Sequence, residues 1–366
     1  MIRAIPLEGV VHQSYLRRLC EEIDRNLREN TDTGVFTFLY RYFQTLLQQR
    51  RLEELEVLIE ALESHTFTVH TNRVHAFVNY VKAYLRKSQG NLKESAHWFR
   101  ETLVKHDELQ QIGMENVEVD CYKELGNLEF HQKLYKCAID KYQSAINRLQ
   151  LNEDSRYMLA IVMYNMALCQ YKLKNYHQTL EYLNKVIPLA KDTSNSYLLL
   201  DTLILKSALL SEHFRHYAEA NKILDQAYEI AQRNQHSSVM NIIWNNWGHN
   251  FFHLKQYVLA EQALQHSIRL SHESNDLEAE LHSGLLLAEI WVAQGREAEA
   301  KQLLKRAVEN ASHNRQYTKE LLDCLELLGQ LETDESLRLK YLEDAYQLAL
   351  KLKKHQKSTK IKKNLT

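Results

Sequence analysis

The sequence predicts an all-α solenoid, a stack of helical hairpins, and three observations support this fold class. A tyrosine recurs at an almost constant interval of 41, 41 and 40 residues, at Tyr135, Tyr176, Tyr217 and Tyr257. A fixed period in this range is typical of helical repeat proteins. The third, seventh and tenth residues after each tyrosine are mostly small or apolar, and these offsets share one helix face. Only 2 Pro and 9 Gly among 366 residues leave few chain breakers.

The N-terminal part, residues 1–70, is predicted to be a separate helical segment that forms a small bundle. Helices are expected at 12–28, 34–49 and 52–64, because apolar residues recur there at helical spacing. A polar turn at 30–34 separates the first two helices. A β-branched, polar connector at 65–72 follows the third helix and marks the boundary of the repeat array.

The repeat array is predicted to span 71–350. Each tyrosine begins the second helix of a hairpin, and the first helix carries a recurring pair upstream: Leu125-Gly126, Met166-Ala167, Ser207-Ala208 and Trp247-Gly248. The spacing of these pairs and tyrosines resembles the tetratricopeptide pattern. Candidate N-caps between the hairpins are Asp154, Ser194, Ser237 and Asp276.

Residues 351–366 form a basic tail, with seven lysines and no acid. Its removal changes the formal net charge from −1 to about −8. We expect this segment to be disordered and to suit the C-terminal dipole of the last helix. A lysine tail is also a potential contact for nucleic acid.

Composition and motifs argue against several functional classes. The five cysteines include no C-x-x-C pair, so neither a disulfide framework nor a zinc knuckle is predicted. No phosphate-binding loop, nucleophile elbow or zinc-protease motif occurs, so we expect no cofactor, no metal and no catalytic residues. His249 and His253 have metal-ligand spacing but no evident third ligand, and are interpreted as groove histidines. Without an apolar span or leader, a cytoplasmic protein with no membrane contact is expected.

The candidate site is a peptide-binding groove. In repeats of this kind the first helix of each hairpin lines the concave side, so residues beside the recurring pair should face the groove. An asparagine amide both donates and accepts, and can hold an extended peptide backbone, while lysines can take a carboxylate. The predicted peptide-binding residues are Lys123, Asn127, Tyr164, Asn165, Lys172, Lys206, Asn245, Asn246 and His249.

The run Val162–Cys169, followed by Asn175-Tyr176, resembles the Y-N-I-G-L-C repeat of Rap proteins. These belong with NprR and PlcR to the RRNPP group of peptide-pheromone receptors. The resemblance implies a right-handed superhelix whose concave face binds a short signalling peptide, and Asn165 and Asn246 match the asparagines that hold it. It further implies quorum sensing through control of a response regulator or of a DNA-binding domain, the chain's own or a partner's, and is compatible with a homodimer.

Two alternatives stay open. One is a general tetratricopeptide scaffold for protein–protein interaction. The other is a Rap-type stimulator of response-regulator dephosphorylation, although the acidic-Gln motif of such proteins is not visible in 12–64, where Gln44, Gln48 and Gln49 occur. Nucleic-acid binding is expected only through a further domain or through the lysine tail.

Overall fold

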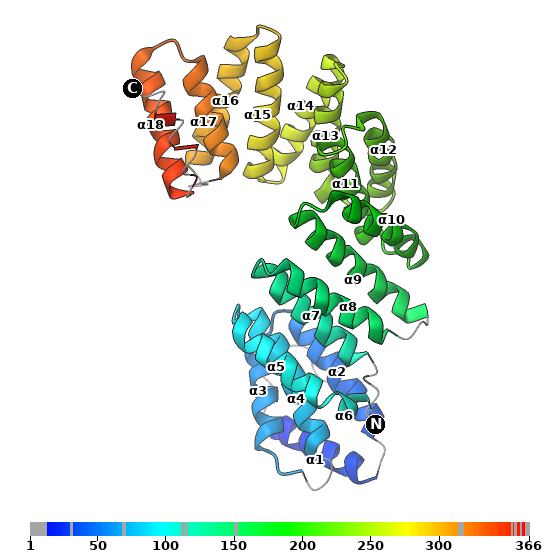
Figure 1. Ribbon diagram of the computed structural model, residues 1–366. Coiled ribbons are helices and arrows are strands. Elements are labelled where there is room, and N and C mark those ends of the chain that lie inside the picture. The colour runs from blue at the N-terminus through cyan, green and yellow to red at the C-terminus, as the bar shows by residue number, and fades with distance from the viewer. Residues whose placement is uncertain are drawn as a thin grey trace. The chain divides into compact units, whose positions relative to one another are not determined.

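The computed structural model of the protein describes residues 13–29, 32–67, 71–110, 114, 116–149, 153–313, 318–352, 354, 357–358 and 361–362. Within these ranges the chain forms 18 α-helices and one 3-10 helix, with no strand (Figure 1). The all-α prediction is therefore confirmed. Backbone contacts divide the chain into two compact units, Met1–Lys185 and Val186–Thr366. Each is described by itself.

Unit 1 contains nine complete helices, and a tenth crosses its boundary. They are α1 (Gln13–Arg28), α2 (Asp32–Gln48), α3 (Leu52–Ser64), α4 (Thr71–Ser88), α5 (Leu92–Val104), α6 (His106–Gln110), α7 (Val117–His131), α8 (Tyr135–Arg148), α9 (Glu153–Lys172) and α10 (Tyr176–Asp192). The first three agree closely with the helices predicted for the N-terminal segment, of which residues 1–12 lie outside the described residues.

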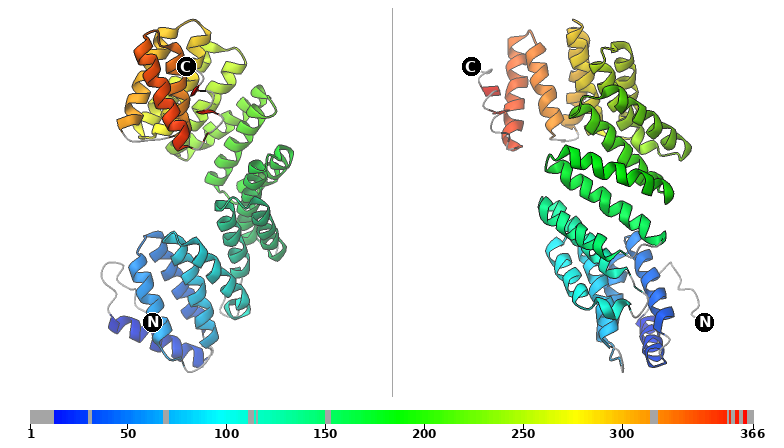
Figure 2. Two further views of the ribbon diagram at one scale, coloured as in Figure 1. Left: turned by 60° about the vertical axis from the view of Figure 1, so that its left-hand side comes forward. Right: turned by 45° about the vertical axis from the view of Figure 1, so that its right-hand side comes forward.

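Unit 2 consists of hairpins joined by short turns, seen from two further directions in Figure 2. Its helices are α11 (Ser196–Glu212), α12 (Tyr217–Arg233), η1 (Ser237–Val239), α13 (Met240–His253), α14 (Tyr257–Glu273), α15 (Leu277–Ala293), α16 (Glu297–His313), α17 (Lys319–Leu331) and α18 (Glu335–Lys351). The four recurring tyrosines begin α8, α10, α12 and α14, as predicted.

The recurring small residue is required where two helices of a hairpin approach closely. A Cβ atom on Gly126 of α7 would lie 2.5 Å from Tyr142 Cε1 of α8. On Gly248 of α13 it would lie 2.5 Å from Leu264 Cγ of α14. Because these separations are well inside van der Waals contact, the Leu-Gly and Trp-Gly pairs of the sequence pattern mark the helix crossings of these two hairpins.

The turns inside the hairpins share a left-handed residue. Lys133, Lys174, Arg215 and Lys255 have φ values of 63°, 63°, 58° and 60°. Gly295 has φ 76° at the matching turn between α15 and α16. A single residue in this conformation reverses the chain directly after a helix, so that the next helix packs back on the one before.

The four predicted N-caps have different outcomes. Asp276 accepts from the backbone N–H of Ala279 at 3.1 Å, so this prediction is confirmed. Ser194 has φ 51° and belongs to the turn, and its neighbour Asn195 caps α11 instead. Ser237 is instead the first residue of the 3-10 helix η1, and the residue at the N-cap of α13 is Val239. The side chain of Asp154 lies outside the described residues.

One apolar core joins the N-terminal helices to the first hairpins. Leu39 and Phe43 of α2 and Leu58 of α3 are buried in the same cluster as Phe77 of α4 and Leu125 of α7. In unit 2 a second cluster joins α15, α16, α17 and α18, and it includes Ile361 from the predicted tail. The three-part division of the sequence at residues 70 and 350 stays a prediction.

Candidate functional site

The predicted peptide-binding residues form two groups. Unit 1 holds Lys123 and Asn127 on α7, and Tyr164, Asn165 and Lys172 on α9; unit 2 holds Lys206 on α11, and Asn245, Asn246 and His249 on α13.

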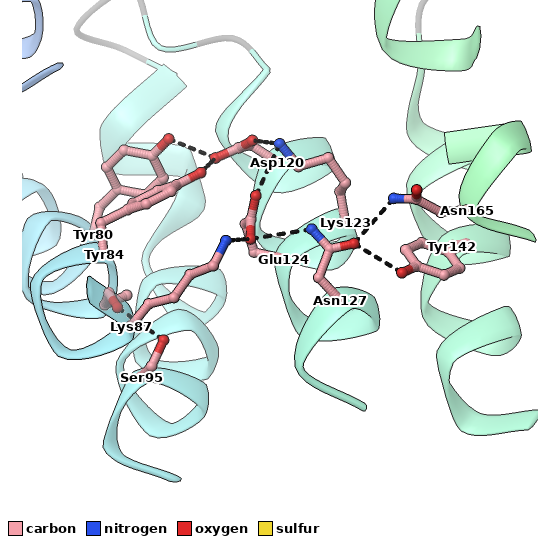
Figure 3. Close-up of polar contacts among 11 residues, drawn as sticks. Tyr80, Tyr84, Lys87, Ser95, Asp120, Lys123, Glu124, Asn127, Tyr142 and Asn165 are labelled. Atoms are coloured by element: carbon pink, nitrogen blue, oxygen red, sulfur yellow. Dashed lines mark hydrogen bonds and ion pairs between the residues drawn. The ribbon is translucent and has the colours of Figure 1, made fainter. Parts of the chain in front are cut away.

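In unit 1 the centre of the group is the carboxylate of Asp120 (Figure 3). Tyr80 and Tyr84, both on α4, donate their hydroxyls to its Oδ2 atom, Tyr80 at 2.6 Å. Lys123 Nζ lies 2.6 Å from its Oδ1 atom. Burial raises the pKa of Asp120, but Lys123 and the two hydroxyls together lower it below its ordinary value. Asp120 is therefore an ionised, fully paired group.

Lys123 is held on both sides. Besides Asp120 it contacts Glu124 Oε1 at 3.0 Å, and Lys87 of α4 pairs with the other oxygen of Glu124. Burial lowers the pKa of Lys123, but the attraction of the two carboxylates outweighs burial and raises it. The cluster contains two cations and two anions, so it offers no net charge to a ligand.

Asn127 continues the network toward α8 and α9. Its amide nitrogen donates to Glu124 Oε2 at 3.2 Å. Its amide oxygen accepts from the Tyr142 hydroxyl at 2.8 Å and from Asn165 Nδ2 at 3.0 Å. The structure thus brings together Lys123, Asn127 and Asn165, as a shared site requires, but it uses their polar groups to bind one another (Figure 3).

The other two predicted residues of unit 1, Tyr164 and Lys172, lie on α9. Tyr164 is half-buried on α9. Lys172 is exposed at the end of the same helix, and its Nζ atom lies 5.8 Å from the ring centre of Tyr171.

Unit 2 contains a pocket of about 390 Å³ between α13, α15 and α17. Its polar lining comes mainly from the first helices of three successive hairpins and includes Asn241, Asn245, Asn246, His282, Ser283 and Glu320. Asn245 donates to Ser283 Oγ at 2.8 Å. Asn246 lines the pocket, is half-buried, and has no hydrogen-bond partner among the described residues.

The two asparagines of equal repeat register therefore differ. Asn165 is bound to Asn127 in unit 1, whereas Asn246 presents a free amide to a pocket in unit 2. Lys206 is half-buried on α11 and does not line this pocket.

Sequence reasoning missed part of the pocket wall. His282 and Ser283 lie on α15 and Glu320 lies on α17, two helices for which the sequence analysis predicted no binding residue. Helical spacing could have found His282, because it lies three residues before Leu285, which is 40 residues after Asn245 and so has the same repeat register.

The predicted histidine pair lies beside the pocket. His249 Nε2 and His253 Nε2 are 3.1 Å apart, and the ring of Tyr217 stacks on His253 at a centroid distance of 4.6 Å. Burial, followed by the neighbouring His253, lowers the pKa of His249. In the part of the chain that the structure describes, no three His, Cys, Asp or Glu side chains are grouped to hold a metal ion.

No described helix has the length and apolar character of a membrane span.

Comparison with known families gives a partial match. The family model of anaphase-promoting complex subunit 5 matches residues 128–203, 168–256 and 246–299. The three overlapping segments lie inside the repeat array, and together they span less than half of the chain.

Solved structures give a more extensive likeness. The apo form of RapI is similar with a TM-score of 0.66 and 15% identity over 85% of each chain. Aspartyl phosphate phosphatase F from Bacillus subtilis has a TM-score of 0.58 and 13% identity, over 93% of this chain and 96% of the other. A Rap protein complexed with competence and sporulation factor has a TM-score of 0.51 and 17% identity, over 94% and 97%.

The fold is that of a tetratricopeptide-like repeat protein. Within that class it is similar to Rap proteins along most of the chain, so the resemblance predicted from the sequence is confirmed at the level of the fold.

Proposed function

We propose that this protein is a receptor for a short peptide and that binding regulates a protein partner. The peptide is bound in extended form on the face of unit 2 that α13, α15 and α17 form around the pocket, which we call the inner face. The observation that supports this most directly is the free amide of Asn246 in a pocket lined by further amides, hydroxyls, a histidine and carboxylates. An extended peptide exposes a backbone N–H and C=O to each side, and a single asparagine amide can satisfy both.

The neighbouring groups suit the same task. Asn245 is fixed by its hydrogen bond to Ser283, so its remaining polar atom has a defined direction. The pocket volume of about 390 Å³ lies within the range of ligand sites. The Rap protein of similar fold was solved with competence and sporulation factor, which supports ligand binding by this class of fold.

The downstream partner in this proposal is a response regulator or a DNA-binding domain in the cytoplasm, as in a quorum-sensing circuit. A peptide can shift such a partner's activity only if it binds one form of the receptor more tightly than the other.

The test is a screen of short synthetic peptides against the wild-type protein, followed by calorimetry with selected binders. Asn246→Ala removes the free amide. A pair of backbone hydrogen bonds contributes about 1–3 kcal/mol, so we expect a loss of affinity of about 5- to 150-fold. The matched control is Asn165→Ala, which removes an asparagine of the same register whose amide is already bound to Asn127; its affinity should stay within about twofold.

Two results would contradict the proposal. If the wild type and Asn246→Ala bind the peptide with equal affinity, the peptide does not bind in this pocket. A screen without binders, combined with recovery of a folded partner in pull-downs, would favour the scaffold alternative.

A second candidate is stimulation of response-regulator dephosphorylation, which the likeness to aspartyl phosphate phosphatase F favours. Helices α1–α3 would supply the contact, and Gln44, half-buried on α2, is the glutamine to test first. Incubation with a phosphorylated response regulator should then speed phosphate loss, and Gln44→Ala should abolish the effect, whereas the exposed Gln48→Ala should not. No acceleration over a range of response regulators would count against this candidate.

A further inference from the structure

The inner face of unit 2 extends beyond the asparagine pocket into a second, acidic pocket of about 250 Å³. On α15 the first pocket takes Glu278 and His282, and the second takes Leu285 and Glu289. These four residues follow one another at intervals of three or four, which places them in one stripe along the helix. The two pockets are therefore neighbours on the same face.

Helix α17 contributes in the same way. Glu320 lines the first pocket, and Asp323, Glu326 and Gln330 line the second. Glu326 is 7% exposed, so its carboxylate is largely withdrawn from water. Burial, and then the nearby charge of Asp323, raise the pKa of Glu289. A cation among these carboxylates offsets their mutual repulsion and the cost of burying them.

The cation is supplied by the chain's own C-terminal segment. Lys357 pairs with Asp323 and lies 3.0 Å from Glu326 Oε2. Among the described residues the other lysine that pairs with Asp323 is Lys319, at 3.9 Å with its side chain 66% exposed, and so exposed an ion pair contributes little. Lys357 is thus a cationic partner of both Asp323 and Glu326 in the acidic pocket.

An apolar contact holds the same segment. Ile361 follows Lys357 by four residues, is 0% exposed and belongs to the core cluster of α15–α18. Ser358 between them is 5% exposed, and its backbone N–H donates to Lys354 O at 2.9 Å. The described residues Lys357, Ser358 and Ile361 of the tail are therefore packed on unit 2. The described part of the tail follows α18 in the chain and is drawn dark red in Figure 1.

We propose that the C-terminal segment is an internal occupant of the peptide-binding face, with Lys357 in the position that a lysine or arginine of the peptide takes when the segment is displaced. This inference rests on the proposed function and specifies it: the ligand is a basic peptide, and binding competes with the tail. Because the tail is tethered, its local concentration is high, so the closed form excludes weak or uncharged peptides.

The test uses the full chain and a fluorescent synthetic peptide that copies residues 351–366 as a basic probe. Lys357→Gln removes the charge that fills the acidic pocket, and the probe should bind this variant at least about tenfold more tightly than the wild type. Lys357→Arg keeps the charge and should behave as the wild type. The matched control is Lys362→Gln, an exposed lysine of the same segment, which should also leave binding unchanged.

Hydrogen exchange gives a readout that needs no ligand. The amide of Ser358, which is bonded to Lys354 O, should exchange faster in Lys357→Gln than in the wild type or Lys362→Gln, while the helices of unit 2 keep their protection. Equal exchange in all three proteins, or equal probe affinity, would overturn the inference. Failure of the proposed function is a different result: with an unaltered tail, Asn246→Ala would bind the peptide as tightly as the wild type does.

Discussion

Replacement of Asp120 by alanine should destabilise unit 1 strongly, because several buried groups depend on this carboxylate. Its side chain is 14% exposed, and that of its partner Lys123 is 15% exposed. Loss of one member of a buried ion pair costs about 3–5 kcal/mol. Lys123 keeps Glu124 at 3.0 Å, which reduces the cost, but the hydroxyls of Tyr80 and Tyr84 lose their acceptor, which adds to it. We therefore expect about 3–5 kcal/mol in total.

Urea unfolding followed by circular dichroism measures this effect. With an m-value of about 2 kcal/mol/M, the midpoint of unit 1 should fall by about 2 M. The control is Asp140→Ala, which removes an exposed carboxylate from α8 and should change the free energy of unfolding by less than about 0.5 kcal/mol. Asp120→Asn should fall between the two, since the amide oxygen still accepts from a tyrosine.

A shift for Asp120→Ala no larger than that of Asp140→Ala would refute the reasoning. It would mean that the network of Figure 3 is hydrated and replaceable, and that Lys123 and Asn127 are available to a ligand after all.

Three further predictions concern unit 2. Gly248→Ala places a Cβ atom 2.5 Å from Leu264 Cγ and should lower the free energy of unfolding by about 1–3 kcal/mol. Gly284→Ala meets nothing within 4 Å and should raise it by up to about 1 kcal/mol. Changes in melting temperature of the same sign for both variants would contradict this. Burial and then His253 lower the pKa of His249, so the folded state favours the neutral imidazole. The free energy of unfolding should therefore fall as the pH drops below 6.5. His249→Gln should reduce the fall in melting temperature over this acidic range. Two lysines lower the pKa of Glu332 from 4.5 to about 2. The contribution of these ion pairs to the free energy of unfolding is therefore present above pH 4.5 and lost as the pH falls toward 2. In Glu332→Gln the melting temperature should fall less over this pH range, and the same fall as in the wild type would count against the prediction.

The hairpins could be predicted from the sequence because their determinants are local and repeated. The interval between Tyr135, Tyr176 and Tyr217 fixes the register, and the small residues fix where the helices cross. Helix boundaries followed from turn residues to within a few positions. Asp276 shows that even a cap can be predicted where a single acid precedes the helix.

The site was harder to predict because it depends on contacts between hairpins. Asn165 and Asn246 have the same register, so the pattern assigned them one role. Their difference arises 38 residues away, where Asn127 supplies the oxygen that binds Asn165. Ser283 fixes Asn245 over a similar separation. Repeat position predicts the face on which a side chain lies, but the neighbouring hairpin decides whether its polar atoms are free.

The lysine tail illustrates the same limit. Composition predicted a solvated segment, since seven lysines with no acid rarely fold by themselves. The acids that receive Lys357 lie 31 and 34 residues upstream on α17, so the match is visible only after α17 and α18 have paired.

The left-handed hairpin residues have a practical consequence for handling the protein. Lys133, Lys174, Arg215 and Lys255 each adopt a conformation that costs an L-residue about 1–2 kcal/mol and glycine almost nothing. All four are at hairpin tips, and neither Arg215 nor Lys255, the two in unit 2, lines the asparagine pocket. Glycine at these tips should therefore give a more stable protein for crystallisation or for the display of variants with altered peptide specificity.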